Sequence, residues 1–183
     1  IIMGRFALQR RRKEAAAVRI MGIDPGYAIV GVGLVDYDNV RFSLVEYGAI
    51  TTPAELPLET RLRQLYDDMR MLLEQYRPDA VAMEQLFFTT NRTTAIAVAE
   101  ARGVLLLAAE QQGVPVFSYT PLQVKSAVVG YGKAEKEQVM EMTRRLLNLR
   151  AVAKPDDAAD ALAMAVCHCH CSGSVMGRLS QYR

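Results

Sequence analysis

Hydrophobic and polar residues follow two different periods along this sequence. Short apolar or alternating runs at residues 19–24, 29–37 and 40–50 are separated by turn residues. This pattern predicts three consecutive β-strands in an antiparallel meander. Between residues 58 and 76, leucines and methionines instead recur three or four positions apart, with arginine and aspartate between them. That second period predicts an amphipathic helix.

After this helix the chain alternates between strands and helices. Short apolar runs at residues 79–86 and 115–119 predict two further strands. Further helices are predicted at residues 91–112, 121–129, 134–148 and 156–170. A meander followed by strand–helix units is typical of an α/β fold, here with a mixed five-stranded sheet and helices on both faces.

The predicted helix at residues 91–112 has almost no polar face. Alanine, valine, isoleucine and leucine occupy most of residues 95–108, so we expect the helix to be buried on two sides. Two interpretations stay open. Either neighbouring elements cover the helix within one domain, or one side packs against a second subunit, because a twofold dimer is the commonest assembly.

Length and composition place the chain among ordinary globular proteins. It has 183 residues, of which 51% are hydrophobic and 23% are charged. A chain of this length forms about one domain and buries its own core. The longest uninterrupted apolar stretch, residues 103–109, is too short to span a bilayer, so no membrane partner is predicted.

All three cysteines lie in the segment Cys167–Cys171, where they alternate with two histidines. An odd number of cysteines at this spacing does not form a disulfide framework, which indicates a reducing compartment and a cytoplasmic protein. The segment lacks the paired spacing of a zinc site and continues an apolar helical pattern. We therefore expect buried thiols and a core or capping histidine, while metal binding by this run stays open.

The net charge of +2 is unevenly distributed. Residues 1–19 carry six basic residues and one acidic residue, whereas the remainder has 16 basic and 19 acidic residues. Nucleic-acid binding by the folded part would therefore need a local basic patch. We expect residues 1–17 to be a disordered leader or expression-derived tail, residues 18–171 the folded domain, and residues 172–183 a disordered C-terminal tail.

Two acidic residues stand where apolar strands end. Asp24 follows the first predicted strand, and Glu84 follows the run Val81–Met83. A carboxylate at the end of a buried strand is costly unless it is paired or bound to a cation. If the two strands are neighbours, these carboxylates converge at one edge of the sheet.

A third group of acids, Asp156, Asp157 and Asp160, opens the last predicted helix. Asp157 and Asp160 share one helix face, and Asp156 is a natural N-cap after Pro155. Taken alone, the group is equally well explained as caps that favour the helix dipole. Acids that converge from separate elements repel one another unless cations lie between them, and hard oxygen ligands suit Mg²⁺ or Mn²⁺. Such clusters support phosphoryl transfer.

A basic segment and an aromatic pair indicate a nucleic-acid substrate. Residues 125–154 hold seven basic and three acidic residues, and Lys125 and Lys136 are candidates for phosphate contacts. Taken alone, this segment is better explained as a solvated helix surface. Phe87 and Phe88 begin a polar loop that ends at Arg92, where an aromatic ring can stack on an unpaired base. The alternative is that both rings belong to the core.

The chain resembles the RuvC-type crossover junction endodeoxyribonucleases, the Holliday junction resolvases. Six segments carry the resemblance in order along more than four-fifths of the chain. They are Gly22–Gly26 (GIDPG), Glu84–Phe87 (EQLF), Ala101–Val104 (ARGV), Tyr119–Lys125 (YTPLQVK), Ala134–Lys136 (AEK) and Asp157–Ala163 (DAADALA). The first segment alone is weak, because sugar kinases and Hsp70-like ATPases have similar turns. The resemblance implies a ribonuclease-H-like fold and a nuclease domain at residues 18–171.

The resemblance also implies a site and a reaction. The metal-binding catalytic acids are expected at Asp24, Glu84, Asp157 and Asp160, and DNA contacts at Phe87, Arg92, Lys125 and Lys136. The expected cofactor is Mg²⁺, replaceable by Mn²⁺, with two ions per site. The expected reaction is hydrolytic cleavage of a four-way DNA junction by paired symmetric nicks, in recombination and repair. The implied partners are a second copy of the chain and a branch-migration motor complex.

Two other functions were weighed against this one. A nucleotide-dependent phosphotransferase built on the turn at Asp24 would need a second phosphate loop, and Gly130–Lys133 lacks the length and hydroxyl residue of a P-loop. A non-catalytic junction-binding protein on the same fold would not need acids at every motif position.

Overall fold

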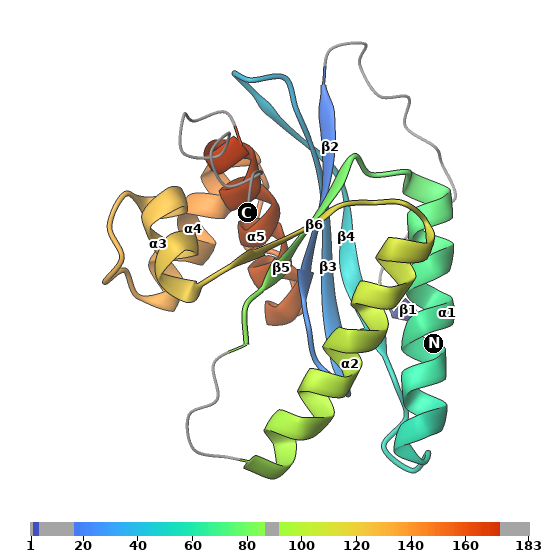
Figure 1. The fold of residues 1–183 in the computed structure, drawn as a ribbon. Helices are drawn as coiled ribbons and strands as arrows, with labels where there is room; N and C mark the ends of the chain where they lie inside the picture. Colours follow the sequence, from blue (N-terminus) through green and yellow to red (C-terminus); the bar gives the residue numbers. More distant parts are fainter. Residues whose placement is uncertain (1, 4–16, 87–91, 173–183) are drawn as a thin grey trace.

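A mixed β-sheet runs through the middle of the molecule in the computed structural model, which describes residues 2–3, 17–86 and 92–172 (Figure 1). The strands are β1 (Ile2–Met3), β2 (Val18–Asp24), β3 (Ile29–Tyr37), β4 (Phe42–Thr51), β5 (Ala80–Glu84) and β6 (Val116–Tyr119). Their order across the sheet is β1-β4-β3-β2-β5-β6. β2, β3 and β4 are antiparallel, whereas β5 and β6 lie parallel to β2 and to each other.

Five helices cover the two faces of this sheet. They are α1 (Leu58–Tyr76), α2 (Arg92–Gln111), α3 (Pro121–Val129), α4 (Lys136–Leu146) and α5 (Asp156–Ser172). Helices α1 and α2 pack together on one face, and α3, α4 and α5 lie on the other (Figure 1). The α/β prediction, with five main strands in a mixed sheet and helices on both faces, is confirmed. The short strand β1, which pairs with β4, was not predicted.

Two of the element boundaries that differ from the prediction have a local reason. β4 begins at Phe42 instead of Val40, because the Asp38 carboxylate accepts hydrogen bonds from the backbone amides of Val40 and Arg41 and extends the turn. α4 begins at Lys136, two residues later than predicted, because Glu135 is its N-cap residue. The side chain of Gln138 completes this cap by accepting a hydrogen bond from the Glu135 amide.

The alternation of side chains along the central strands builds two hydrophobic layers. Ile20 and Val35 belong to the layer shared with α3, α4 and α5. Met21, Ile23 and Val32 belong to the layer beneath α1 and α2. These side chains are almost completely buried, so the helices on both faces are packed firmly against the sheet.

Helix α5 lies directly on the backbone of the two central strands, and glycines make this approach possible. A Cβ atom at Gly22 would lie 1.8 Å from the carbonyl oxygen of Ala161, and one at Gly31 would lie 2.0 Å from that of Asp157. Real Cβ contacts are not this short, so any larger residue would push the helix away. The glycines therefore fix how closely the acids of α5 approach the sheet.

The cysteine-rich end of α5 is part of the core, as predicted. Cys167 and Cys169 are fully buried free thiols, and His168 is 5% exposed. The Nδ1 atom of His168 lies 2.8 Å from the hydroxyl oxygen of Tyr119, and the two groups share a hydrogen bond. Within the described residues, no group of three or more histidine, cysteine or acidic side chains is arranged to hold one metal ion.

The predictions about the ends of the chain fall mostly outside the described residues. Residues 4–16 and 173–183 are not described, so their predicted disorder stays a prediction. Ser172, assigned above to the C-terminal tail, is the last residue of α5. No helix in the described part of the chain is long and apolar enough to cross a membrane.

A candidate carboxylate active site

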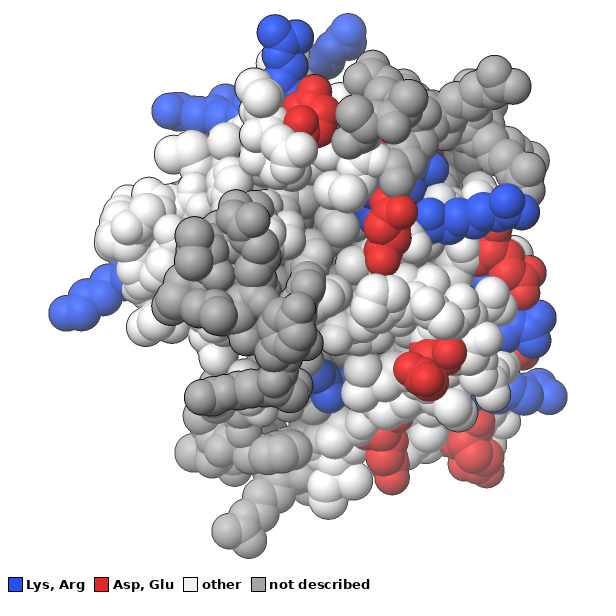
Figure 2. Space-filling view, turned by 45° about the horizontal axis from the view of Figure 1, so that its top comes forward, with Lys and Arg blue, Asp and Glu red and all other residues white. Residues whose placement is uncertain are grey.

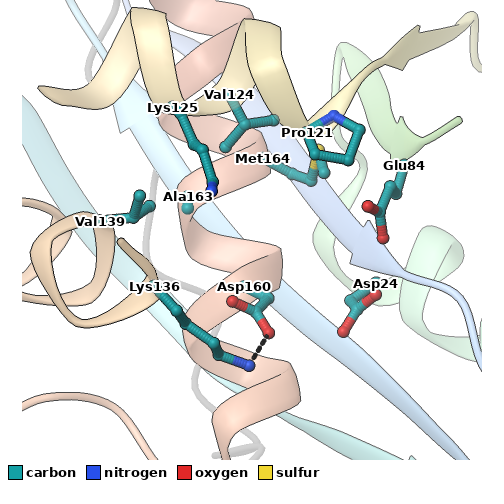
Figure 3. A pocket seen from close by; sticks show the side chains of 10 residues that line it. All are labelled: Asp24, Glu84, Pro121, Val124, Lys125, Lys136, Val139, Asp160, Ala163 and Met164. Carbon is teal, nitrogen blue, oxygen red and sulfur yellow. Dashed lines mark hydrogen bonds and ion pairs between the residues drawn. The ribbon is translucent and has the colours of Figure 1, made fainter. Parts of the chain in front are cut away.

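Asp24 and Glu84 are the last residues of β2 and β5, which are adjacent parallel strands. Ile23 pairs with Met83 in their register, so the two acids that follow emerge at the same edge of the sheet. The close view in Figure 3 shows both side chains pointing into one pocket. Their convergence, predicted only if the strands were neighbours, follows from this strand pairing.

Helix α5 brings the third and fourth acids to the same place. Asp160 lines the pocket opposite Asp24 (Figure 3). Asp157, one turn earlier, is not among the lining residues, yet its charge acts on both Asp24 and Asp160. Asp156 is the first residue of the helix instead of its N-cap, and it forms an ion pair with Lys154 at 2.6 Å.

The pKa values of the site acids reflect their burial and their closeness to one another. Burial, followed by the charges of Glu84, Asp160 and Asp157, raises the pKa of Asp24 to about 7. Burial also raises the pKa of Glu84, while a hydrogen bond from Asp24 lowers it. A hydrogen bond between two carboxyl groups needs a proton on one of them, and a nearby positive charge would favour its release.

Lys136 supplies part of that positive charge. Its Nζ lies 2.7 Å from a carboxylate oxygen of Asp160, and this ion pair raises the pKa of Lys136 (Figure 3). Burial raises the pKa of Asp160, and Lys136 opposes that shift. Because Lys136 is the first residue of α4, the Glu135 cap that starts this helix also places the ammonium group at the site.

The pocket has a volume of about 210 Å³ and an apolar wall opposite the acids. Lys125 lines it from α3, whose first turn is fixed by hydrogen bonding between Thr120 and Gln123. Five residues of this wall were not among the predicted site residues. They are Pro121, Val124, Val139, Ala163 and Met164. Four of them occupy apolar helix positions, which the sequence pattern assigns to the hydrophobic core. Only the packing of the helices shows that they line the site.

The donor set fits hard divalent cations. All the polar ligands at this strand edge are carboxylate oxygens, which Mg²⁺ and Mn²⁺ prefer, and no thiol or imidazole faces the pocket. The raised pKa of Asp24, caused first by burial and then by the charges of Glu84, Asp160 and Asp157, supports the same fit, because a bound cation would offset both effects. In the described residues no three acids stand close enough to enclose one ion, and Lys136 occupies one oxygen of Asp160.

Two predicted DNA-contacting residues cannot be placed in the site. Phe87 and its neighbour Phe88 lie outside the described residues. Arg92 is the first residue of α2, but its side chain is not described. By contrast, Arg102, which lay inside one of the quoted motifs without a predicted role, contacts the backbone of Glu84.

Figure 2 shows the end of the molecule that lies opposite the carboxyl ends of β2 and β5. Among the described residues visible there, lysine, arginine, aspartate and glutamate side chains are interspersed, and neither sign of charge gathers over one element. This balance matches the small net charge of the chain.

Comparison with known proteins identifies the family. Residues 20–168 match the family model described as crossover junction endodeoxyribonuclease RuvC. The chain belongs to the RuvC family. A RuvC from Brevibacillus brevis is 57% identical over 149 residues, which cover 81% of this chain and 90% of that protein. RuvC from Thermotoga maritima is 51% identical, with 81% and 89% covered.

Solved structures agree with this assignment to the RuvC family. The chain resembles Thermus thermophilus RuvC in complex with a Holliday junction substrate, with a TM-score of 0.79 and 33% identity, over 87% of this chain and 97% of that one. The yeast mitochondrial resolvase Ydc2 has the same fold, with a TM-score of 0.62 and 13% identity, over 91% and 83% of the chains. The predicted RuvC resemblance and ribonuclease-H-like fold are confirmed.

Proposed function

We propose that this RuvC-family protein is an endonuclease that resolves four-way DNA junctions by paired symmetric nicks during recombination and repair. The observation that carries the proposal is the convergence of Asp24, Glu84 and Asp160 on one pocket, with the charge of Asp157 close enough to act on Asp24, in a chain of this family. The match to a RuvC structure in complex with a Holliday junction substrate supports the choice of DNA substrate.

The four acids would hold divalent cations at the scissile phosphate. We propose two Mg²⁺ ions, replaceable by Mn²⁺, with Asp24 and Glu84 on one side and Asp157 or Asp160 on the other. Such ions lower the pKa of a bound water and stabilise a leaving oxygen. The carboxylates of this chain would fix where those ions lie, and the ions would in turn position the phosphate.

Lys136 and Lys125 would hold the DNA backbone at this site. The ammonium of Lys136 offsets the charge of Asp160 at 2.7 Å and lies at the pocket rim, where a phosphate would enter. Both lysines would bind phosphates regardless of base sequence, so affinity should fall steeply with salt. Phe87 and Arg92 stay predicted contacts to bases near the branch point.

We propose that the active form is a homodimer formed through α2. One side of this helix packs on α1, while Ile96 and Leu107 are 61% and 51% exposed, with Gly103 between them on the outer side. A twofold axis through this surface would give two equivalent sites on a junction that is itself nearly twofold symmetric.

A branch-migration motor complex is a further proposed partner of this chain. The free cysteines support action in the cytoplasm, where thiols stay reduced.

The test is cleavage of a labelled synthetic four-way junction, compared with a linear duplex of matching sequence. We expect paired nicks on the junction in Mg²⁺, and none in EDTA. Asp24→Asn removes a site carboxylate with little change in shape, so cleavage should fall by at least about a hundredfold while junction binding persists. Asp67→Asn, a substitution at an exposed acid of α1, is the matched control and should cleave normally.

Two outcomes would contradict this proposal. Cleavage by Asp24→Asn within a few-fold of the wild-type rate would remove Asp24 from the chemistry. Wild-type protein that binds the junction but leaves it whole in both Mg²⁺ and Mn²⁺ would favour the non-catalytic junction-binding function.

A further inference from the structure

The side chain of Arg102 joins α2 to the ends of two strands beside the acids. Its Nε donates a hydrogen bond to the backbone carbonyl oxygen of Glu84 at 3.2 Å. One terminal nitrogen of the same guanidinium donates to the hydroxyl oxygen of Ser118 at 2.8 Å. One planar group therefore binds the last residue of β5 and a residue of β6 at the same time.

These two contacts lie where the sheet ends. β5 and β6 are parallel, with Glu84 opposite Tyr119 and Met83 opposite Ser118. The backbone pairing between the strands continues to Gln85, whose amide donates to the carbonyl of Tyr119 at 2.9 Å. On the other side of β5, the pairing with β2 ends at Met83, one residue before Glu84, so fewer strand bonds restrain the backbone that carries the carboxylate.

We propose that Arg102 is a positioning residue that fixes the backbone of Glu84 and thereby the direction in which its carboxylate enters the site. This proposal rests on the nuclease function proposed above. Arg102 does not touch the pocket, and it reaches Glu84 from the sheet face covered by α1 and α2. Lys136 and Asp160 lie on the opposite face, on α4 and α5.

The guanidinium is suited to this role in a way that other side chains are not. Its donors are held in a rigid plane, so binding one acceptor fixes the direction of the next. A lysine at the same position keeps the charge but has a single flexible ammonium. The proposed function therefore needs the shape of Arg102 more than its charge, and Arg102→Lys separates the two properties.

The placement of Arg102 also connects Glu84 to the proposed dimer helix. Arg102 is followed directly by Gly103, and both line a surface pocket with Leu106, Gln85 and Ser118. A displacement of α2 would therefore be carried to the end of β5 through one side chain. In this way the geometry of one acid depends on how α2 is held.

The experiment compares Arg102→Met and Arg102→Lys with the control Arg70→Met, which changes an exposed arginine of α1. Four quantities are measured: single-turnover junction cleavage, junction affinity in EDTA, Mn²⁺ affinity of the free protein by calorimetric titration, and the melting temperature. We expect Arg102→Met to cleave about tenfold more slowly, because small displacements of a site group cost rate. Its Mn²⁺ affinity should also fall several-fold, its junction affinity in EDTA should stay near wild type, and Arg102→Lys should recover less than half of the rate.

Each outcome decides the proposal. Wild-type cleavage and Mn²⁺ affinity in Arg102→Met would overturn it, as would full rescue by Arg102→Lys, which would show that charge alone suffices. Loss of junction affinity in EDTA together with a lower melting temperature would assign Arg102 to general stability and also overturn it. If the wild-type protein itself does not cleave, the nuclease proposal fails, whereas the Mn²⁺ titration still decides whether Arg102 organises Glu84.

Discussion

At the scale of single residues, burial shifts the pKa values of two groups in opposite directions, because one is an acid and the other is a base. Asp24 is a buried acid among other acids, and its pKa rises to about 7. His168 is a buried base in the core, and burial lowers its pKa from 6.5 to about 4. The first shift shows that the Asp24 carboxylate is costly to ionise there, a cost that a nearby cation or lysine would offset. The second keeps a neutral ring bonded to Tyr119 and packed on Phe117.

The His168 shift predicts a loss of stability in acid. Between pH 6.5 and pH 4 the unfolded chain binds a proton at this position that the folded chain does not, so stability falls as the pH decreases. From the two pKa values, the loss between pH 7.5 and pH 5 is about 2 kcal/mol. Urea unfolding of the wild type and of His168→Gln at both pH values should show a smaller loss by about this amount in the variant.

This comparison isolates His168 because Asp24 and the other acids are common to both proteins. The raised pKa values of Asp24, Glu84 and Asp160 act in the opposite direction to His168, and lowered values such as that of Glu141 act in the same direction. Both kinds cancel in the difference between the two proteins. An equal change in unfolding free energy for wild type and variant between the two pH values would contradict the prediction.

At the scale of elements, the distance between α5 and the sheet sets the geometry of the site. The acids of α5 meet those of β2 and β5 because Gly22 and Gly31 have no side chain under the helix. In α5, Ala158, Ala161 and Ala165 are fully buried, so both surfaces are small at this contact. The closeness that brings the carboxylates together is thus produced by residues that have no role in the chemistry.

Gly22→Ala tests this arrangement. Alanine is ordinarily preferred to glycine within a strand by a fraction of a kcal/mol to about 1 kcal/mol. Here its Cβ would meet backbone at 1.8 Å, so we expect a loss of about 2–4 kcal/mol in the free energy of unfolding, measured with urea. Ser43→Ala, at an exposed position of β4, should change stability by less than about 0.5 kcal/mol. A Gly22→Ala protein as stable as wild type would disprove the close contact.

At the scale of the whole molecule, the sheet separates two functions. The face with α3, α4 and α5 carries the pocket and its lysines, and the face with α1 and α2 carries the proposed dimer surface. The carboxyl ends of β2 and β5 lie between them. Substitutions on the two faces should therefore alter assembly and the pocket separately, apart from the link that Arg102 makes between α2 and Glu84.

Leu107→Glu tests whether the exposed side of α2 is the dimer interface. A buried carboxylate at the centre of an apolar interface is not tolerated, so we expect a monomer by sedimentation equilibrium where the wild type is a dimer. Helix content should be unchanged, because Leu107 is half-exposed in the single chain. The control Met71→Glu, at a 45% exposed position of α1, should stay dimeric. A Leu107→Glu protein that remains a dimer would place the interface elsewhere.

Local pattern alone determined much of this protein. The strand ends at Asp24 and Glu84, the acidic start of α5 and the apolar character of α2 were all predicted, because each depends on residues within one or two turns or one strand. The buried thiols of Cys167 and Cys169 followed from the same helical period. The six motifs gave the family for a related reason, since each occupies a short continuous segment.

The tertiary structure alone decided which distant groups touch. The ion pair of Lys136 with Asp160 spans 24 positions, the bond of Tyr119 with His168 spans 49, and Arg102 reaches Glu84 across 18. No periodic pattern encodes such pairs, because they depend on which faces of which elements pack together. That packing is set by strand order and by the bare backbone of Gly22 and Gly31, so the distances within the site exist only once the whole sheet and α5 are assembled.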